Sequence, residues 1–244
     1  MGVHLHQPAK AVHLSRDVNG GVTSLLIRGD DGEEHTIPCT RLLITAGAWT
    51  SRVFDTLFPS SSIRVPVSQL AGHSIVVKSP RWTAEHEAKG CHAIFTTMRD
   101  GFSPEIFSRI GEEIYVAGLN DASIPLPEGP MDAKIDQESI GELKAIAQKL
   151  LGKDGIDVSD LEVLREGLCF RPVTNAGVPI VCRISDTELS AGTAADPLPS
   201  NGVFIAAGHG PWGISHSLGT GKVMSEMIEG RKLSADIGSL GMQL

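Results

Sequence analysis

The segment GVFIAAGHGPWGI at residues 202–214 predicts three kinds of local structure in one short run. Its apolar residues 202–207 are typical of a buried strand. The six residues 208–213 satisfy the pattern G-x-G-x-x-G, and the following stretch predicts a helix that ends at Gly230. Glycines between a strand and a helix let the backbone come close to a ligand. The segment therefore indicates an α/β protein with a ligand-binding turn.

The pattern at 208–213 alone would suggest a dinucleotide-binding turn, but its context argues against that interpretation. Only residues 231–244 follow the helix, so the second strand and its acidic residue are missing. Pro211 has no N–H to donate to a pyrophosphate, and Trp212 places an indole side chain where the backbone should come close to the dinucleotide. A nicotinamide-dependent dehydrogenase is therefore the least favoured of the three functions considered in this section. The N–H groups at the start of the helix would still favour a partly negative ligand atom.

A second strand, turn and helix are predicted from LLITAGAW at residues 42–49. The strand covers 41–45, and the residues after it fall at helical spacing: Trp49, Val53, Phe54 and Leu57. Small residues at the carboxyl end of a strand can admit a cofactor, although packing alone explains them equally well. Ahead of this unit, three β-rich runs separated by turn signals predict a meander: 10–16, 22–28 and 34–38.

The middle of the chain has a different sequence pattern, in which short strand-like runs are joined by irregular segments. They predict an antiparallel sheet from the segments 65–67, 73–78, 92–96, 104–108 and 113–118. One long helix is predicted over 136–151, with Asp136 as its N-cap. Two further strands follow at 161–170 and 178–184.

Composition excludes several classes of protein. The 244 residues are 41% apolar and 20% charged, which is globular and fits one large domain or two intertwined ones. A net charge of −8 lacks the basic footprint of nucleic-acid binding. The longest apolar runs are far shorter than the roughly 20 residues of a membrane helix. Four cysteines without a C-x-x-C pair give no metal site and favour reduced thiols in the cytoplasm.

Two side chains stand out as candidates for chemistry. Arg171, just before Pro172 at the end of a predicted strand, could clamp a carboxylate or pair with a structural acid. His209 lies inside the glycine turn. Hydrolase motifs such as G-x-S-x-G and H-E-x-x-H are absent. The residues by themselves thus predict an α/β protein that binds a redox cofactor or another ligand.

Three ordered blocks resemble the D-amino-acid-oxidase-like (DAO) family of flavoproteins. Residues 42–49 resemble its V-L-A-A-G-A-W segment, and 167–180 are similar to its G-x-R-P-x-T-x-D-G-x-P-I block. Residues 203–222 resemble the closing block, whose turn faces the flavin ring. The segments 68–76 and 104–118 look like the branch of FAD-dependent oxidoreductases found in fungi and plants.

The resemblance implies an α/β fold (α+β overall) with an incomplete Rossmann-like FAD-binding domain and an antiparallel-sheet substrate domain. Residues 1–62 and 160–244 would form the first domain, and 63–159 the second. The family opens with a strand, G-x-G-x-x-G and a helix that hold the FAD pyrophosphate, and Met1 would lie downstream of them. An N-terminally truncated form is therefore expected, and its sheet would lack a central strand and expose apolar edges.

The family's site residues carry over only where this sequence matches its motifs. The first turn would lie along FAD through Ala46, Gly47 and Trp49. The second would contact the isoalloxazine through Gly208, His209, Gly210, Gly213 and Ile214. The positive end of the helix that follows would then stabilise reduced, anionic flavin.

Three more positions bear on the substrate and on flavin attachment. Arg171 matches the arginine that holds a substrate carboxylate in glycine-oxidase-like members. Cys169 matches the position of the cysteine that sarcosine-oxidase-like relatives link covalently to FAD. The alternative is that Cys169 is a buried, unreactive thiol. Trp212 stands where those relatives have a lysine, which argues against a sarcosine-type substrate.

The resemblance implies oxidation of a small-molecule amine or amino acid by hydride transfer to FAD. Such chemistry needs orientation and electrostatics more than reactive side chains. The alternative is a non-catalytic fragment, an interaction module that binds no FAD. Substrate, electron acceptor and oligomeric state are left open.

Overall fold

The computed structural model describes residues 2–99, 101–152, 160–189 and 201–242. The chain divides into two compact units: unit 1 is Met1–Ser68 with Arg171–Leu244, and unit 2 is Gln69–Phe170. Helices, parallel strands and antiparallel strands occur together, which confirms the α/β (α+β overall) class. The assignment of cofactor and substrate roles to the two parts stays a prediction. Among the described residues, no helix is long and apolar enough to cross a membrane.

Unit 1 begins with an antiparallel meander. Its strands β1 (Ala9–Arg16), β2 (Val22–Gly29) and β3 (Glu34–Pro38) pair in chain order, as predicted. The carboxylate of Asp17 accepts hydrogen bonds of 2.8 Å from the N–H groups of Asn19 and Gly21, which closes the first hairpin turn. Local turn chemistry of this kind explains why the sequence alone located the hairpins.

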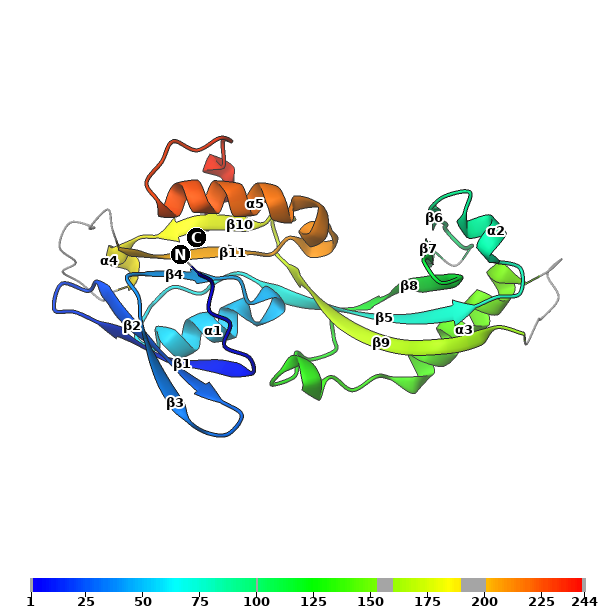
Figure 1. The fold of residues 1–244 in the computed structure, drawn as a ribbon, viewed down its shortest axis with the longest axis horizontal. Coiled ribbons are helices and arrows are strands. Elements are labelled where there is room, and N and C mark those ends of the chain that lie inside the picture. The colour runs from blue at the N-terminus through cyan, green and yellow to red at the C-terminus, as the bar shows by residue number, and fades with distance from the viewer. Residues whose placement is uncertain (1, 100, 153–159, 190–200, 243–244) are drawn as a thin grey trace. The chain divides into compact units, whose positions relative to one another are not determined.

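The second sheet of unit 1 has the order β10-β11-β4, from β10 (Ile180–Ile184), β11 (Gly202–Ala207) and β4 (Arg41–Ile44). β11 pairs parallel with β4 and antiparallel with β10. All of β11 is buried because both faces are covered. One face packs with α1 (Thr50–Leu57) and the other with α5 (Gly213–Ile228), which lies across β10 and β11 in Figure 1.

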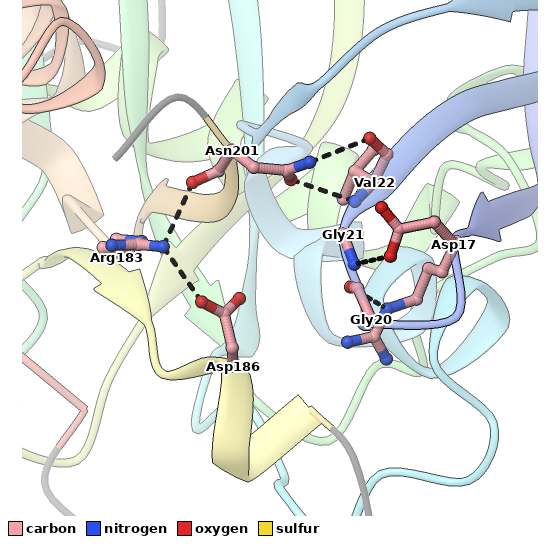
Figure 2. A network of polar contacts seen from close by, with 8 residues as sticks. Asp17, Gly20, Gly21, Val22, Arg183, Asp186 and Asn201 are labelled. Carbon is pink, nitrogen blue, oxygen red and sulfur yellow. Dashed lines mark hydrogen bonds and ion pairs between the residues drawn. The ribbon is translucent and has the colours of Figure 1, made fainter. Parts of the chain in front are cut away.

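A polar network joins the meander to this sheet at the start of β11 (Figure 2). Asn201 Oδ1 accepts a hydrogen bond of 2.9 Å from Val22 N, and its Nδ2 donates one of 3.0 Å to Val22 O. Arg183 Nη2 donates to Asn201 O at 3.1 Å and to Asp186 Oδ2 at 3.0 Å. The side chain of Asn201 thus bonds both the N–H and the C=O of Val22, as a residue of a paired strand would, although the two residues are far apart in the sequence.

Unit 2 is built on a five-stranded sheet of order β6-β7-β8-β5-β9. Its strands are β5 (Ser68–Lys78), β6 (Ala93–Phe95), β7 (Glu105–Arg109), β8 (Glu113–Asp121) and β9 (Glu162–Val173). The helix α3 (Gln137–Leu151) packs on one face through Ile140 and Leu143, both fully buried. Asp136 Oδ2 accepts a hydrogen bond of 2.8 Å from Ser139 N, so the predicted N-cap is confirmed.

The predicted strand at 65–67 is wrong. Val65 and Val67 are buried, which gives the alternating pattern of a strand, but neither belongs to a ladder. Instead, Ser51 Oγ lies 2.8 Å from the carbonyl oxygens of both valines. The single hydroxyl proton of Ser51 can be donated to either carbonyl, and Val65 O also accepts the N–H of Val67, so local contacts take the place of a neighbouring strand.

Short helical segments complete the described structure. They are α2 (Ala84–Glu87), α4 (Asp186–Leu189) and the 3-10 turns η1 (Gly47–Trp49), η2 (Pro130–Asp132), η3 (Gly210–Trp212) and η4 (Gly238–Leu240). Two of the 3-10 turns, η1 and η3, lie directly between a strand and a helix of unit 1. They form the turns described next.

Candidate functional site

Two strand–turn–helix units of the same construction meet at one edge of the unit 1 sheet. Because β4 and β11 are parallel and Ile44 pairs with Ile205, their carboxyl ends lie together. β4 leads through η1 into α1, and β11 leads through η3 into α5. The carboxyl edge of parallel strands is where α/β proteins bind ligands. The two predicted flavin-facing turns therefore share one location.

The backbone of the second turn is shaped by glycine. Gly208 has φ +82°, and a Cβ there would lie 2.6 Å from Thr174 Cγ2, so any other residue would strain the backbone and displace this methyl group. Gly210, at φ +56°, faces open space, with no atom of the described residues within 4 Å of an added Cβ. The first glycine is needed for packing, whereas the second leaves the backbone open to a ligand.

A third predicted segment reaches the same turn. Thr174 Oγ1 donates a hydrogen bond of 2.6 Å to Val178 O, which holds the turn between β9 and β10. Thr174 and Pro179 lie against Gly208, and Ile180 pairs with Ala207. Three blocks far apart in the sequence thus converge at the glycine turn.

His209 is held inside this turn. Its Nε2 lies 3.0 Å from Thr220 Oγ1 on α5, and its ring centroid lies 6.5 Å from that of His216. Burial of the ring, followed by the neighbouring His216, lowers the pKa of His209. The neutral imidazole is favoured, so one ring nitrogen can donate a hydrogen bond while the other accepts one.

A cavity of about 480 Å³ opens at this edge, between the sheet and α5. Its walls include Leu43, Thr45, Ala206, His209, Gly213 and Thr220. The helix contributes small residues four positions apart, Gly213, Ser217 and Gly221, and these leave room beside it. Within the described residues, no side-chain hydrogen bond caps the first turn of α5, so N–H groups there can bind a partly negative ligand atom.

The predicted site residues do not all lie in this cavity. Gly208, Gly210 and Gly213 belong to the second turn with His209, and Ala46, Gly47 and Trp49 to the first. Ile214, in the first turn of α5, has 95% of its surface exposed.

The two predicted residues from β9 lie outside these turns. Arg171 is half-buried near the end of β9, in unit 1. Cys169 belongs to unit 2 and is exposed, with Sγ 3.7 Å from Gly72 O, so it is not the buried thiol of the alternative hypothesis.

Sequence reasoning did not single out Thr174, Ser217 or Thr220. Ser217 could have been suspected, because small residues recur every four positions on α5 at Gly213, Ser217 and Gly221, whereas Thr220 lies outside that series. Thr174 carries no comparable local signal, since its partner Gly208 is distant in the sequence.

Apolar surface is exposed next to the cavity, as the sequence analysis expected. β4 is the last strand of its sheet, and in the described part of the chain its outer edge has no partner. Leu43 on β4 is 37% exposed, while Ile214 and Leu218 on α5 are 95% and 88% exposed. A sheet edge and a helix face of this kind are normally covered in a stable protein.

Comparison with known proteins agrees with this architecture. The chain superimposes on glycine oxidase from Geobacillus kaustophilus with a TM-score of 0.69 and 18% identity, covering 98% of this chain and 53% of that one. Iminodiacetate oxidase (IdaA) from Chelativorans sp. BNC1 gives 0.64 and 16%, covering 94% and 51%. At such identities the likeness shows the fold.

Sequence relatives identify the family. The chain is 30% identical over 209 residues to "Putative oxidoreductase TDA3" of Saccharomyces cerevisiae, covering 84% of this chain and 34% of the relative. It is 31% identical over 212 residues to "Putative oxidoreductase C1F5.03c" of Schizosaccharomyces pombe, covering 84% and 46%. The chain thus spans less than half the length of these relatives. Residues 1–227 match the family described as DAO, FAD dependent oxidoreductase. The chain belongs to this family of FAD-dependent oxidoreductases.

Proposed function

We propose that this chain supplies the flavin-ring part of the FAD site in an enzyme that oxidises a small-molecule amine or amino acid. The observation that carries the proposal is the meeting of two glycine turns and the uncapped start of α5 at one sheet edge. Sequence outside these 244 residues would supply the strand and helix that bind the pyrophosphate. The open edge of β4 supports this part of the proposal, because a further strand can pair there.

The residues at this edge fit FAD. The open side of Gly210 admits a flat ring system against the backbone, and the cavity walls are apolar or small. The free N–H groups of α5 suit a partly negative edge of such a ring. Gly208, Gly213 and Ile214 would contact the flavin ring with Gly210, and Ala46, Gly47 and Trp49 would lie along FAD.

The protein's own side chains would orient the reactants. When bound, FAD supplies the hydride acceptor. His209, fixed by Thr220 and favoured in its neutral form, would hydrogen-bond a reactant at the turn. Arg171 would bind a substrate carboxylate with its planar fork. Each acts by orientation and electrostatics, which suffices for chemistry of this kind.

Cys169 is proposed as a flavin contact, and the experiment below distinguishes a covalent bond from a non-covalent contact. Its thiol is exposed, so a ligand can reach it. A thioether bond to the flavin would survive acid precipitation, whereas a non-covalent contact would not.

The test is the visible absorption spectrum of the purified chain supplied with FAD, taken before and after acid precipitation. A flavin spectrum with release into the supernatant is the expected result and means a competent, non-covalent site. Yellow protein in the pellet, lost in Cys169→Ser, would mean covalent attachment. Folded but colourless protein would refute the proposal and favour the non-catalytic interaction module.

A further inference from the structure

The imidazole of His209 has one ring nitrogen with a partner and one without. Its Nε2 lies 3.0 Å from Thr220 Oγ1, whereas among the described residues its Nδ1 makes no hydrogen bond. The ring is half-buried in the wall of the cavity between the sheet and α5, and this burial, followed by the neighbouring His216, lowers the pKa of His209. The neutral ring carries a single proton, so the bond at Nε2 determines whether Nδ1 donates or accepts.

The hydroxyl proton of Thr220 is not used within its own helix. Serine and threonine hydroxyls in helices commonly donate to a backbone carbonyl about one turn earlier. In α5 the hydroxyls of Ser215, Ser217 and Ser225 each donate to the carbonyl oxygen three residues earlier. Thr220 Oγ1 makes no such bond, and in the described part of the chain its partner is His209 Nε2. The ring nitrogen is therefore the acceptor available to this hydroxyl.

Two residues of α5 hold the His209 ring. His216 and Thr220 are four positions apart, so they lie on the same face of the helix. Thr220 bonds Nε2, and the ring of His216 lies 6.5 Å from that of His209 at an interplanar angle of 62°. The threonine is also β-branched, which restricts its χ1 rotamers in a helix. The orientation of the imidazole is thus fixed before any ligand binds.

We propose that Thr220 is a positioning residue that sets the tautomer of His209. Its hydroxyl donates to Nε2, the ring proton resides on Nδ1, and His209 presents this N–H as a hydrogen-bond donor to the flavin ring. The carbonyl oxygens and unprotonated nitrogens of a flavin accept hydrogen bonds, whereas the opposite tautomer would oppose a lone pair to them. The flavin contact rests on the proposed function, but the tautomer is a property of the chain without FAD.

The first test reads the tautomer in the absence of FAD. Two-dimensional NMR of the whole 15N-labelled chain, at mildly alkaline pH, distinguishes protonated from unprotonated ring nitrogens, and the signals of His209 are those lost in His209→Gln. We expect the Nδ1–H form in the parent and in Thr220→Ser, which keeps the hydroxyl. Thr220→Val keeps the branched shape but removes the donor, so the Nε2–H form should increase. An Nε2–H form in the parent, or the same tautomer in Thr220→Val, would overturn the proposal.

Thr56 provides a matched control on another helix. It is an exposed residue of α1, and its Oγ1 donates a hydrogen bond of 2.9 Å to Arg52 O of the same helix. Thr56→Val therefore makes the same chemical change away from His209, and it should leave the His209 signals and the FAD affinity unchanged. Equal changes in Thr56→Val and Thr220→Val would mean a general effect on the fold and would refute the positioning role.

The second test is titration of each variant with FAD, followed by flavin fluorescence. Thr220→Val should bind FAD about two- to tenfold more weakly than the parent, the range expected for one hydrogen bond, and Thr220→Ser should restore the affinity. Equal FAD affinity of the parent and Thr220→Val would refute the contact between His209 and the flavin. Failure of the parent to bind FAD would refute the proposed function, whereas the NMR result would still decide the tautomer.

Discussion

Replacing Gly210 by alanine separates a backbone role in flavin binding from a role in folding. Gly210 has φ +56°, and among the described residues nothing lies within 4 Å of an added Cβ, so the methyl group clashes with none of them. The cost to folding is then backbone strain alone, about 1–2 kcal/mol for an L-residue in the left-handed region. Reduced freedom of the unfolded chain offsets about 0.4–1 kcal/mol of it. The expected net loss is about 1 kcal/mol.

Gly32 provides the matched control. It has φ +83° in the turn between β2 and β3, and an added Cβ there also faces open space. Gly32→Ala should therefore lower the free energy of unfolding by a similar amount, about 1 kcal/mol. Only Gly210→Ala places its methyl group where the flavin is proposed to approach. Its flavin affinity should fall by about tenfold or more, equivalent to about 1.4 kcal/mol.

The assay combines urea denaturation of each variant with titration of FAD, followed by flavin fluorescence. Equal FAD affinity of Gly210→Ala, Gly32→Ala and the unsubstituted chain would refute the contact between this backbone and the flavin. Equal losses of affinity in both variants would mean that the effect comes through stability. Failure of the unsubstituted chain to bind FAD would refute the proposed function itself.

Three further outcomes are expected. Asn201→Ala removes both hydrogen bonds to Val22 and should lower the free energy of unfolding by about 1–3 kcal/mol in urea denaturation; an unchanged value would contradict the bridging role. Arg171→Ala, in a full-length flavin-loaded enzyme, should raise KM for carboxylate-bearing substrates without changing flavin content, and a loss of flavin would make Arg171 structural. Hydrogen bonds from the side chain and backbone of Ser139 lower the pKa of Asp136 in the folded protein. The Asp136 carboxylate therefore stabilises the fold fully above its unfolded-state pKa, and this stabilisation is lost as the pH falls through the lower folded-state pKa. Asp136→Asn keeps a cap but does not titrate, so acid thermal melts should show a smaller pH dependence than the parent; identical pH profiles would contradict this.

Much of the secondary structure could be predicted because its signals are local. The strand at 202–207 has the predicted bounds, and Asp136 caps its helix as expected. Apolar periodicity, turn glycines and capping residues act over a few positions, so a single sequence displays them. The strand predicted at 65–67 shows the limit: alternation reports burial, but a strand also needs a pairing partner, and Ser51 takes that place.

The candidate site was only partly predictable. Glycine turns and His209 stand out in the sequence because their residue types are unusual between a strand and a helix. Thr174 and Thr220 do not, because each matters only through a residue that the fold brings to it.

The sequence by itself determined the family, most of the strands and longer helices, and the two glycine turns. Tertiary structure alone decided that these turns share one edge, because that follows from parallel pairing of β4 with β11. This pairing joins segments separated by most of the chain, and its register depends on buried faces and backbone hydrogen bonds that no local pattern contains. The same long-range packing of α5 against the sheet creates the cavity between them.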